Sequence, residues 1–357
     1  MKKVFFVTNE LSGGGAERVI SVLANYLSKC AYKVSIIALQ GTAKMEYSID
    51  KGIDIIEWTD HMSGDFRGQI RFIRSQMKQN PDATFISFFT HQNLYTILAS
   101  MGLSNRVIVS ERNDPHYSIN GKVKKILRTL LYASRMCDSV VFQTQGAMDY
   151  FPKVIQKKGI IIANPLKEGL PRRFEGVRKK VIVSFGRLEA QKNYPMLIDA
   201  FARFQKCHPE YSLVLYGRGS QEADLKKKVL EMNLENNVEF AGFSKNVHDE
   251  IRDATVFVLP SNYEGLSNSM LEAMAIGLPV ICTDCPPGGA REYIQDYSNG
   301  ILVRVGDAEG VCKALNYIVE NRRQAEMISK NAEKIRCLLS SDVISGKWEK
   351  LISKLSL

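Results

Sequence analysis

Two glutamates eight residues apart are the feature of this sequence with the most evident chemical use. Glu264 and Glu272 follow an apolar run that ends at Pro260, and we expect a helix to begin at Gly265. Eight residues of helix rise roughly 12 Å, whereas the paired carboxylates of a glycosidase stand ~5–9.5 Å apart. The spacing therefore favours two acids that hydrogen-bond hydroxyls at opposite ends of one extended ligand. An ordinary capped helix with surface glutamates fits the pattern equally well.

The expected start of this helix is also a candidate phosphate site. A helix N-terminus presents backbone N–H groups that lack helical partners, together with the positive end of the helix dipole, and both attract anions. On this interpretation Glu264 lies in the loop before the helix, and Glu272 lies about two turns inside it.

Two basic residues follow another apolar run. Arg187 and Lys192 come directly after Val181–Phe185, at the expected end of a buried strand. A forked guanidinium and a point-charge ammonium together suit a diphosphate. The sequence offers no cluster of acids for Mg²⁺, so we expect no metal site and expect these cations to neutralise a leaving group themselves. Two solvated cations on a loop are the alternative.

Three consecutive glycines follow the first apolar run, Val4–Thr8. Gly14 and Gly15 would let the backbone approach a ligand closely at the start of a helix. The pattern is not the dinucleotide-binding fingerprint, because Arg18 replaces the third glycine and Gln40 follows the second strand where an acid is expected. Nicotinamide chemistry is therefore disfavoured.

The whole chain alternates short β-rich runs with longer helical segments, which is typical of doubly wound α/β sheets. The strands predicted in the first half are Val4–Thr8, Val34–Leu39, Ile53–Glu57, Thr84–Phe89, Arg106–Ser110, Val140–Thr144 and Ile160–Ile162. Those predicted in the second half are Val181–Phe185, Leu213–Tyr216, Val238–Phe240, Val256–Leu259, Val280–Cys282 and Ile301–Val303. We expect two Rossmann-like domains, residues 1–165 and 166–340, that face each other across a cleft. The basic stretch Lys167–Lys180 is interpreted as a linker, and the last helix, within 341–357, could pack back on the first domain.

The composition is that of a soluble globular protein, with 357 residues, 45% hydrophobic and 24% charged. No apolar run is long enough to span a membrane, and the apolar start is too short for a signal peptide, so a cytoplasmic protein is expected. Cys282 and Cys285 form a single C-x-x-C, which without a second pair indicates no zinc site. The net charge of +10 suits nucleic acid, an anionic membrane or phosphorylated ligands. The sequence has no zinc-finger spacing or RNA-binding aromatic string, so nucleic acid is not an expected partner.

Taken together, these motifs resemble the retaining glycosyltransferases of the large group 1 class, whose architecture is the GT-B fold. The resemblance is carried by G-G-A-E-R after the first strand, F-G-R-L-x-x-x-K-N at the start of the second half, and E-x₇-E followed by A-x-G-x-P-V. It covers nearly the whole chain in the expected order. Ser110–His116 and Cys285–Glu292 further resemble enzymes that assemble bacterial surface polysaccharides.

The resemblance implies how the donor is divided among the site residues. Arg187 and Lys192 would hold the donor diphosphate and Glu264 would contact the transferred sugar, as the catalytic set, while Glu272 would contact the ribose. Further implied donor contacts come from a glycine loop (Gly14, Gly15), a segment bordering the base (Gly242, Phe243) and backbone amides that bind phosphate (Leu266, Ser267).

The activity implied is transfer of a sugar from a nucleoside diphosphate sugar, with UDP-hexose or UDP-N-acetylhexosamine expected, to a hydroxyl of a lipid-linked or growing saccharide. The resemblance implies retention at the anomeric carbon and no cofactor. Another GT-B enzyme, such as a sugar phosphorylase or a nucleotide-sugar epimerase, is the alternative. A phosphate- or nucleic-acid-binding module is a more remote one.

The acceptor side departs from the family pattern. Many relatives place a histidine near the end of the strand that here begins at Val107, where Glu111 and Arg112 stand instead. His91 follows another predicted strand and could approach an acceptor. The acceptor-side candidates are therefore His91, Glu111 and Arg112.

A basic amphipathic helix in the first half indicates peripheral contact with an anionic membrane surface. Its apolar stripe comprises Val123, Ile126, Leu127, Leu130 and Leu131, and its basic residues are Lys122, Lys124, Lys125 and Arg128. A second basic helical segment carries Arg67, Arg71, Arg74 and Lys78. The alternative is that the apolar stripe belongs to the core, and we expect it to be at least partly buried.

Overall fold

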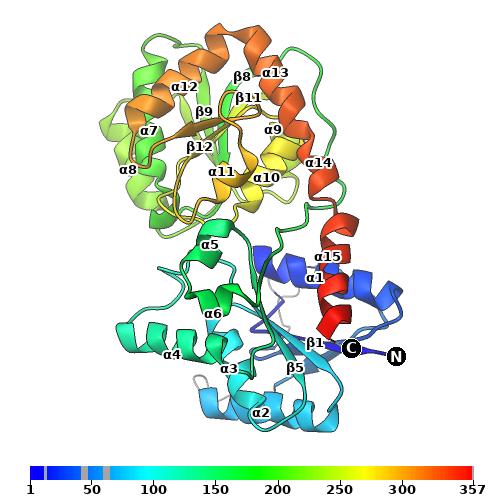
Figure 1. Ribbon diagram of the computed structural model, residues 1–357. Helices are drawn as coiled ribbons and strands as arrows, with labels where there is room; N and C mark the ends of the chain where they lie inside the picture. The colour runs from blue at the N-terminus through cyan, green and yellow to red at the C-terminus, as the bar shows by residue number, and fades with distance from the viewer. Residues whose placement is uncertain (12–13, 42–46, 59–64, 356–357) are drawn as a thin grey trace. The chain divides into compact units, whose positions relative to one another are not determined.

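The computed structural model describes residues 1–11, 14–41, 47–58 and 65–355. The chain divides into two compact units. Unit 1 comprises Met1–Pro165 and Ser340–Leu357, and unit 2 comprises Leu166–Leu339. Each unit is an α/β domain with its own parallel sheet (Figure 1), which confirms the predicted fold class.

Unit 1 is built on a parallel sheet whose strands, within the described residues, run in the order β3-β2-β1-β4-β5-β6-β7. These strands are β1 (Lys3–Thr8), β2 (Lys33–Ala38), β3 (Asp54–Glu57), β4 (Thr84–Phe88), β5 (Arg106–Ser110), β6 (Ser139–Phe142) and β7 (Gly159–Ile161). The helices are α1 (Gly15–Lys29), α2 (Phe66–Gln79), α3 (Thr90–Ala99), α4 (Lys122–Ala133), α5 (Gln145–Asp149), α6 (Lys153–Gln156) and α15 (Ser341–Leu355).

Unit 2 repeats the arrangement, with a described strand order of β10-β9-β8-β11-β12-β13. Its strands are β8 (Lys179–Phe185), β9 (Ser212–Tyr216), β10 (Val238–Gly242), β11 (Ala254–Leu259), β12 (Val280–Thr283) and β13 (Ile301–Val303). Its helices are η1 (Ala190–Lys192), α7 (Tyr194–Gln205), α8 (Glu222–Glu231), α9 (Val247–Ile251), α10 (Asn268–Ala275), α11 (Gly289–Tyr293), α12 (Ala308–Glu320), α13 (Arg322–Glu333) and α14 (Ile335–Leu338).

The strand order in each unit fixes where a ligand can bind. In unit 1 the chain leaves β1 toward β2 on one side and returns to β4 on the other. In unit 2 the chain likewise leaves β8 toward β9 on one side and returns to β11 on the other side of β8. Connections leave such a pair of strands in opposite directions, which opens a crevice at the carboxyl ends, where doubly wound sheets bind ligands. The ends of β1 and β4, and those of β8 and β11, are therefore the positions to inspect.

The last helix, α15, is an integral part of unit 1. Trp348 is fully buried, and its ring stacks on Phe88 of β4 with centroids 5.7 Å apart. The Tyr26 hydroxyl donates to Glu349, and the Tyr32 and Ser353 hydroxyls lie 2.9 Å apart. Burial of a whole indole against the sheet is a large apolar contribution, so the core of unit 1 includes this C-terminal segment.

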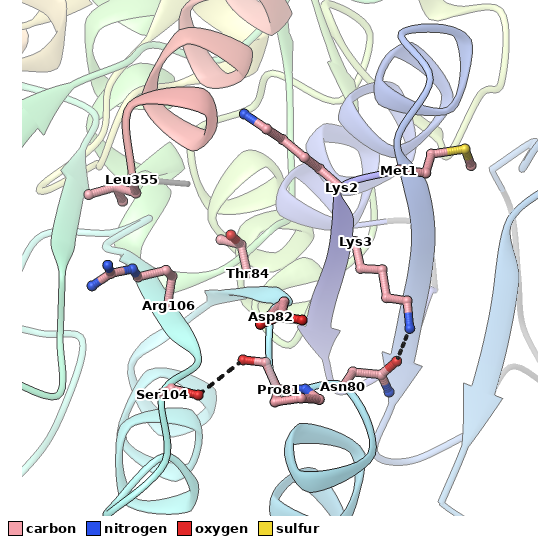
Figure 2. Close-up of a pocket in the computed structure, with 10 residues that line it drawn as sticks. All are labelled: Met1, Lys2, Lys3, Asn80, Pro81, Asp82, Thr84, Ser104, Arg106 and Leu355. Carbon is pink, nitrogen blue, oxygen red and sulfur yellow. Dashed lines mark hydrogen bonds between the residues drawn. The ribbon is translucent and has the colours of Figure 1, made fainter. Parts of the chain in front are cut away.

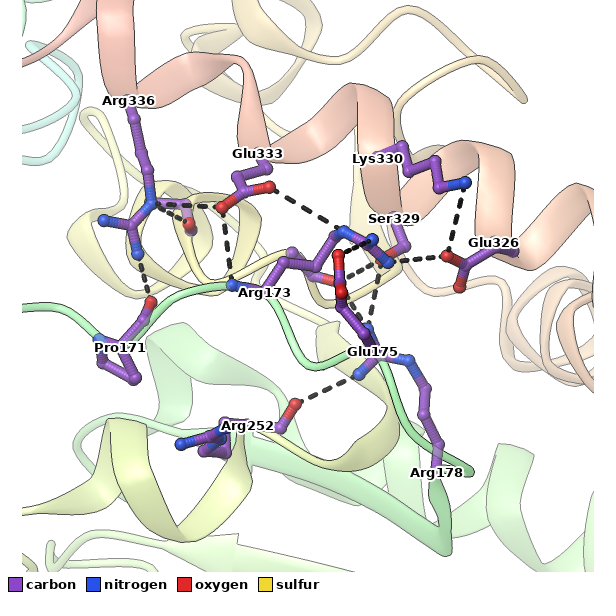
Figure 3. A network of polar contacts seen from close by, with 12 residues as sticks. Pro171, Arg173, Glu175, Arg178, Arg252, Glu326, Ser329, Lys330, Glu333 and Arg336 are labelled. Atoms are coloured by element: carbon purple, nitrogen blue, oxygen red, sulfur yellow. Dashed lines mark hydrogen bonds and ion pairs between the residues drawn. The ribbon is translucent and has the colours of Figure 1, made fainter.

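The stretch predicted as a linker is largely fixed to unit 2 (Figure 3). The Arg173 side chain is 9% exposed, donates to Glu326 at 2.6 Å and pairs with Glu333 at 3.8 Å. Arg178 donates to the carbonyl of Gly277 at 2.7 Å, and Arg336 donates to the carbonyl of Pro171. Residues 171–178 of the stretch interpreted as a linker, Lys167–Lys180, are therefore held against unit 2 by three guanidiniums.

Helix α4 buries less of its apolar stripe than the sequence led us to expect. Val123, Ile126 and Leu130 are 79%, 60% and 63% exposed. Leu127 is 44% exposed, and of the predicted stripe only Leu131 is buried. The face that meets the domain carries Arg128 instead. None of the helices in the described part of the chain is long and apolar enough to cross a membrane.

Arg128 is fully buried, so the prediction that it is a surface cation was wrong. Its guanidinium donates to Ser118 Oγ at 2.6 Å and to the Pro115 carbonyl at 3.1 Å. It also lies over the rings of Tyr150 and Phe151, 5.2 and 4.9 Å from the centroids. These contacts replace the water that a guanidinium would otherwise keep, and they turn the apolar side of α4 outward.

Candidate functional site

The loop after β8 holds the two predicted cations at the carboxyl edge of the second sheet. Arg187 is exposed, and its side chain forms no hydrogen bond or ion pair within the described residues, whereas Lys192 ends the short helix η1. The loop lies backbone to backbone against the loop after β9, and a Cβ on Gly217 would stand 1.9 Å from the Gly186 carbonyl oxygen. A glycine is therefore required for this approach, which sets the direction in which Arg187 leaves the sheet.

Hydrogen bonds join the β8 loop to the loop that follows β11. The Asn262 amide donates to the Gln191 carbonyl at 2.8 Å, and the Gln191 side chain donates to the Tyr263 carbonyl at 2.9 Å. Asn193 donates to the Asn262 side chain at 2.9 Å. These hydrogen bonds thus join the two loops into one edge over β8 and β11, the neighbouring strands whose connections leave on opposite sides.

Lys192 and Glu264 meet at this edge as an ion pair. Lys192 Nζ lies 2.5 Å from Glu264 Oε1, and the side chains are 12% and 13% exposed. The Ser261 hydroxyl donates to the same oxygen at 2.8 Å. Because a charged hydrogen bond is stronger where water is scarce, the pair fixes Glu264 beside a cation. The sequence predicted both residues as functional but not their contact.

Helix α10 begins later than predicted. Its first residue is Asn268, and Ser267 is the N-cap, whose hydroxyl accepts from the Met270 amide at 3.5 Å. The expectation that the helix starts at Gly265 was wrong, because Gly265 lies in a loop closely covered by Gly289, where a Cβ would stand 2.4 Å from the Gly265 carbonyl oxygen. Glu272 consequently lies about one turn inside the helix rather than two.

Two of the predicted donor positions, Leu266 and Ser267, lie at the capped end of α10 and are buried. Gly242 ends β10 with φ +70°, and Phe243 follows it with a side chain that is 59% exposed. Unit 2 therefore carries every predicted donor-side residue except Gly14 and Gly15, and it groups them along the carboxyl edge of its sheet.

Glu272 has a partner that the sequence did not reveal. Its carboxylate is buried, and its Oε2 lies 2.7 Å from Nε2 of His248 in α9. The His248 ring is also buried and meets Phe185 edge to face, with centroids 5.6 Å apart. A lone histidine near the start of a five-residue helix gives no sequence signal of this contact, which depends on how α9 and α10 pack.

Unit 1 has a cavity of about 290 Å³ at the carboxyl ends of β1, β4 and β5. It contains all three acceptor-side candidates, His91, Glu111 and Arg112. The other lining residues are Asn9, Glu10, Glu17, Phe89, Thr90, Gln92, Asn113 and Ser118. Phe89 has φ +72°, a conformation that L-residues rarely adopt. Backbone strain of this kind gathers at functional sites, which agrees with the position of the cavity.

Glu111 is held by two hydroxyls at this cavity. It is 1% exposed, accepts from Tyr132 at 2.5 Å and lies 3.4 Å from Thr90 Oγ1. Burial, followed by the charge of Glu111, raises the pKa of Tyr132 well above its ordinary value, so the phenol remains a donor. His91, at the start of α3, is exposed.

Arg112 reaches the cavity from a largely aromatic setting. Its guanidinium lies 4.2 Å from the Phe88 ring centroid and 5.7 Å from that of Trp348, and it donates to Asn164 at 2.8 Å. Burial lowers the pKa of Arg112 to about 9. Arg112 therefore also stabilises unit 1, because its side chain links the end of β5 to Asn164 and to Trp348 of α15.

Glu17 is a second residue that the sequence analysis did not select. It lies in the first turn of α1 and lines the same cavity. A Cβ on Gly14, the N-cap of α1, would stand 2.0 Å from its Oε2, so the carboxylate occupies the space that the missing side chain leaves. Burial raises the pKa of Glu17, its own backbone N–H lowers it, and the nearby charge of Glu10 raises it further. The adjacent Gly15 is exposed.

A larger concavity of about 490 Å³ lies at the amino edge of the first sheet (Figure 2). Lys2, Lys3 and Arg106 line it, and Lys3 donates to Asn80 at 2.9 Å. None of the predicted site residues reaches it, and doubly wound sheets bind their ligands at the opposite edge. Within the described residues no group of three or more His, Cys, Asp or Glu side chains could hold a metal ion.

Comparison with known proteins agrees with the grouping of these residues in unit 2. Residues 171–335 match the family described as Glycosyl transferases group 1. The chain carries a group 1 glycosyltransferase domain. Arg187, Lys192, Glu264 and Glu272 all lie inside the matched residues, as does His248.

Relatives of similar length extend beyond the group 1 domain. An uncharacterized glycosyltransferase of Haemophilus influenzae is 29% identical over 96% of both chains. A Campylobacter jejuni enzyme is 27% identical over 99% of both, and its name is GalNAc-alpha-(1->4)-GalNAc-alpha-(1->3)-diNAcBac-PP-undecaprenol alpha-1,4-N-acetyl-D-galactosaminyltransferase. An amylovoran biosynthesis glycosyltransferase of Erwinia amylovora is 24% identical over 99% of this chain and 100% of its own. The protein is therefore a glycosyltransferase.

Solved structures share the fold of the whole chain. HepE of Anabaena, crystallised with UDP, aligns with a TM-score of 0.82 over 99% of this chain and 100% of its own, at 19% identity. The architecture is thus that of the GT-B glycosyltransferases, as the group 1 resemblance implied.

The raised pKa of Glu17 predicts a stability effect that depends on pH. A folded-state pKa above the unfolded value means that folding favours the protonated acid, so stability falls as pH rises from about 4.5 through the raised pKa. We expect Glu17→Gln, which cannot ionise, to gain stability over the wild type between pH 4.5 and 7.5. Urea unfolding at several pH values measures this difference.

The control is Asp82→Asn, which changes an exposed carboxylate in the same unit. It should alter stability little across the same pH range. A Glu17→Gln advantage that stays constant with pH would contradict the proposed ionisation cost.

Proposed function

We propose that this glycosyltransferase moves a sugar from a UDP-sugar, a hexose or N-acetylhexosamine donor, to a hydroxyl of a lipid-linked or growing saccharide, with retention at the anomeric carbon. The observation that carries the proposal is the Lys192–Glu264 pair beside the exposed Arg187, at the strand reversal of the group 1 domain. The UDP bound to HepE and the undecaprenol-linked glycan in the name of the Campylobacter relative support the choice of donor and acceptor.

The leaving group is a diphosphate, and unit 2 supplies the charges to stabilise it. The guanidinium of Arg187 forms no hydrogen bond or ion pair in the described chain, so its fork is available to two phosphate oxygens. Lys192 adds a point charge and remains attached to Glu264. Fixed charges aimed at the oxygens that become negative in the transition state are a large source of rate enhancement.

Glu264 would then serve the transferred sugar without acting as a nucleophile. Its Oε1 accepts hydrogen bonds from both Lys192 Nζ and the Ser261 hydroxyl. These two contacts hold the carboxylate in one orientation, which suits hydrogen bonding to sugar hydroxyls. In a front-face retaining reaction the donor phosphate itself accepts the proton of the attacking hydroxyl, so no protein base is needed.

The unit 1 cavity is the proposed acceptor subsite. Its carboxylates, Glu10, Glu17 and Glu111, can accept hydrogen bonds from sugar hydroxyls, and His91 stands exposed at its edge. Gly14 and Gly15 belong to the same carboxyl edge of the sheet. Arg112 contributes by holding β5 in place as well as by lining the cavity.

The diphosphate contacts predict a selective loss in a binding experiment. Arg187→Ala should weaken UDP binding about tenfold or more, because a hydrogen bond to a charged group contributes about 1.5–3 kcal/mol. Uridine, which lacks phosphate, should bind the variant and the wild type equally. Isothermal calorimetry with both ligands makes the comparison.

The matched control is Lys206→Ala, which removes an exposed cation elsewhere in unit 2. It should leave UDP affinity unchanged. Unchanged UDP affinity in Arg187→Ala would remove this residue from the donor site and would weaken the proposed mechanism.

We further propose that transfer needs no metal ion, because Arg187 and Lys192 provide the positive charge that Mg²⁺ supplies in other enzymes. UDP affinity and donor turnover should therefore be the same in EDTA and in Mg²⁺. Calorimetry and UDP release on extensively chelated protein measure both. Full activity that returns only on addition of Mg²⁺ or Mn²⁺ would identify a metal requirement.

We propose that the protein works at the cytoplasmic face of a membrane and binds it through α4. The α4 apolar face, comprising Val123, Ile126, Leu127 and Leu130, is solvent-exposed. Lys122 and Lys124 flank it and are also exposed, as are Lys153 and the 53% exposed Val154 of α6. An exposed apolar face bordered by lysines suits an anionic lipid surface, where each basic side chain contributes about 1 kcal/mol.

This surface predicts binding to vesicles that depends on both lysines and apolar side chains. The wild type should float with anionic liposomes at low salt and less at high salt, since salt screens the charges. The triple substitution Val123→Ser, Ile126→Ser and Leu130→Ser should abolish flotation. Lys122→Glu with Lys124→Glu should weaken it most on anionic lipid.

The control is Leu230→Ser, which removes a 61% exposed leucine from α8 in unit 2. It should float like the wild type. Arg128 is left unchanged because it is buried. Flotation that survives the triple substitution would show that α4 is not the contact surface.

A further inference from the structure

The carboxylate of Glu272 and the segment after β10 are connected by one buried side chain, His248. His248 lies in α9, five residues after the exposed Phe243 and three before Ile251, the last residue of the helix. The histidine side chain is 8% exposed and that of Glu272 is 6% exposed. Such a polar contact is retained in an interior only with good geometry, and the 2.7 Å separation of Nε2 and Oε2 meets that condition.

The direction of the histidine ring is fixed from the other side. Phe185, the last residue of β8, presents its ring to His248 at 83° with centroids 5.6 Å apart, and Phe185 also packs on Phe257 of β11. Arg187 follows Phe185 by two residues. The imidazole therefore contacts both the end of β8, which leads into the loop of Arg187, and the helix that carries Glu272.

We propose that His248 is a positioning residue for the nucleoside half of the donor: it donates from Nε2 to Glu272 and so holds the carboxylate in the orientation that receives the ribose hydroxyls. The inference rests on the proposed donor role of Glu272. A buried carboxylate on a helix has several rotamers, and a charge-assisted hydrogen bond selects one of them. The neutral tautomer with hydrogen on Nε2 is sufficient for this bond.

Two substitutions separate the hydrogen bond from the packing of the ring. His248→Phe keeps an aromatic ring against Phe185 and removes the donor. His248→Gln keeps an N–H donor and removes the ring. We expect His248→Phe to raise the Kd of UDP about tenfold, and we expect His248→Gln to stay within about threefold of the wild type. Isothermal calorimetry with UDP measures both on protein whose thermal unfolding is recorded in parallel.

A double-substitution cycle tests whether His248 acts through Glu272. Glu272→Ala alone should weaken UDP binding, and adding His248→Phe to it should cause no further loss, because the bond that it breaks is already gone. His208→Ala is the matched control, since His208 pairs with Glu320 at 3.7 Å within the same unit but away from α10. It should leave UDP affinity unchanged.

The outcomes distinguish the inference from the proposed function. If Glu272→Ala leaves UDP affinity unchanged, the assignment of the ribose contact fails, and the inference fails with it. If Glu272→Ala weakens binding but His248→Phe does not, only the positioning role is overturned. A large loss in His248→Gln with none in His248→Phe, or losses that multiply in the double variant, would assign the histidine to packing instead.

Discussion

The ion pair between Lys192 and Glu264 is the contact on which the donor-side geometry depends. It joins the loop after β8 to the loop after β11. These two parallel strands are neighbours in the second sheet, and their connections leave on opposite sides. Neither charge is well solvated, so each requires the other, and removal of one partner leaves the other poorly compensated. Ser261 and the cross-loop hydrogen bonds of Asn262 then complete a rigid edge from which Arg187 projects. A single pair of opposite charges thus positions a cation and a carboxylate at once.

The strands could be predicted from sequence because parallel strands buried on both faces are continuous apolar runs. The run Arg106–Ser110, for example, forms β5 with the same bounds, and Ile301–Val303 forms β13. The start of α10 was harder to place. Ser267 was a usable N-cap signal, but the interpretation of Gly265 as helical ignored it. The backbone contact with Gly289 that keeps Gly265 in a loop comes from a segment more than twenty residues away.

Contacts between distant side chains could not be predicted from one sequence. The pairing of His248 with Glu272 depends on two helices that flank β11, and nothing local in either helix indicates it. Periodicity likewise showed which side of α4 is apolar but not whether another element covers that side. Arg128 is buried because the Pro115 carbonyl and the Ser118 hydroxyl accept its hydrogen bonds, and both groups lie in an irregular loop. In each case tertiary packing decides, as it does for most polar groups in an interior.

The outward apolar face of α4 has a consequence for the protein in water. Val123, Ile126, Leu127 and Leu130 form a contiguous apolar strip on one helix, and such strips favour association with any surface that removes them from solvent. A second copy of the same strip is one such surface, and mass action makes that pairing more populated as the protein is concentrated. We therefore expect the apparent molar mass of the purified protein to rise with its concentration.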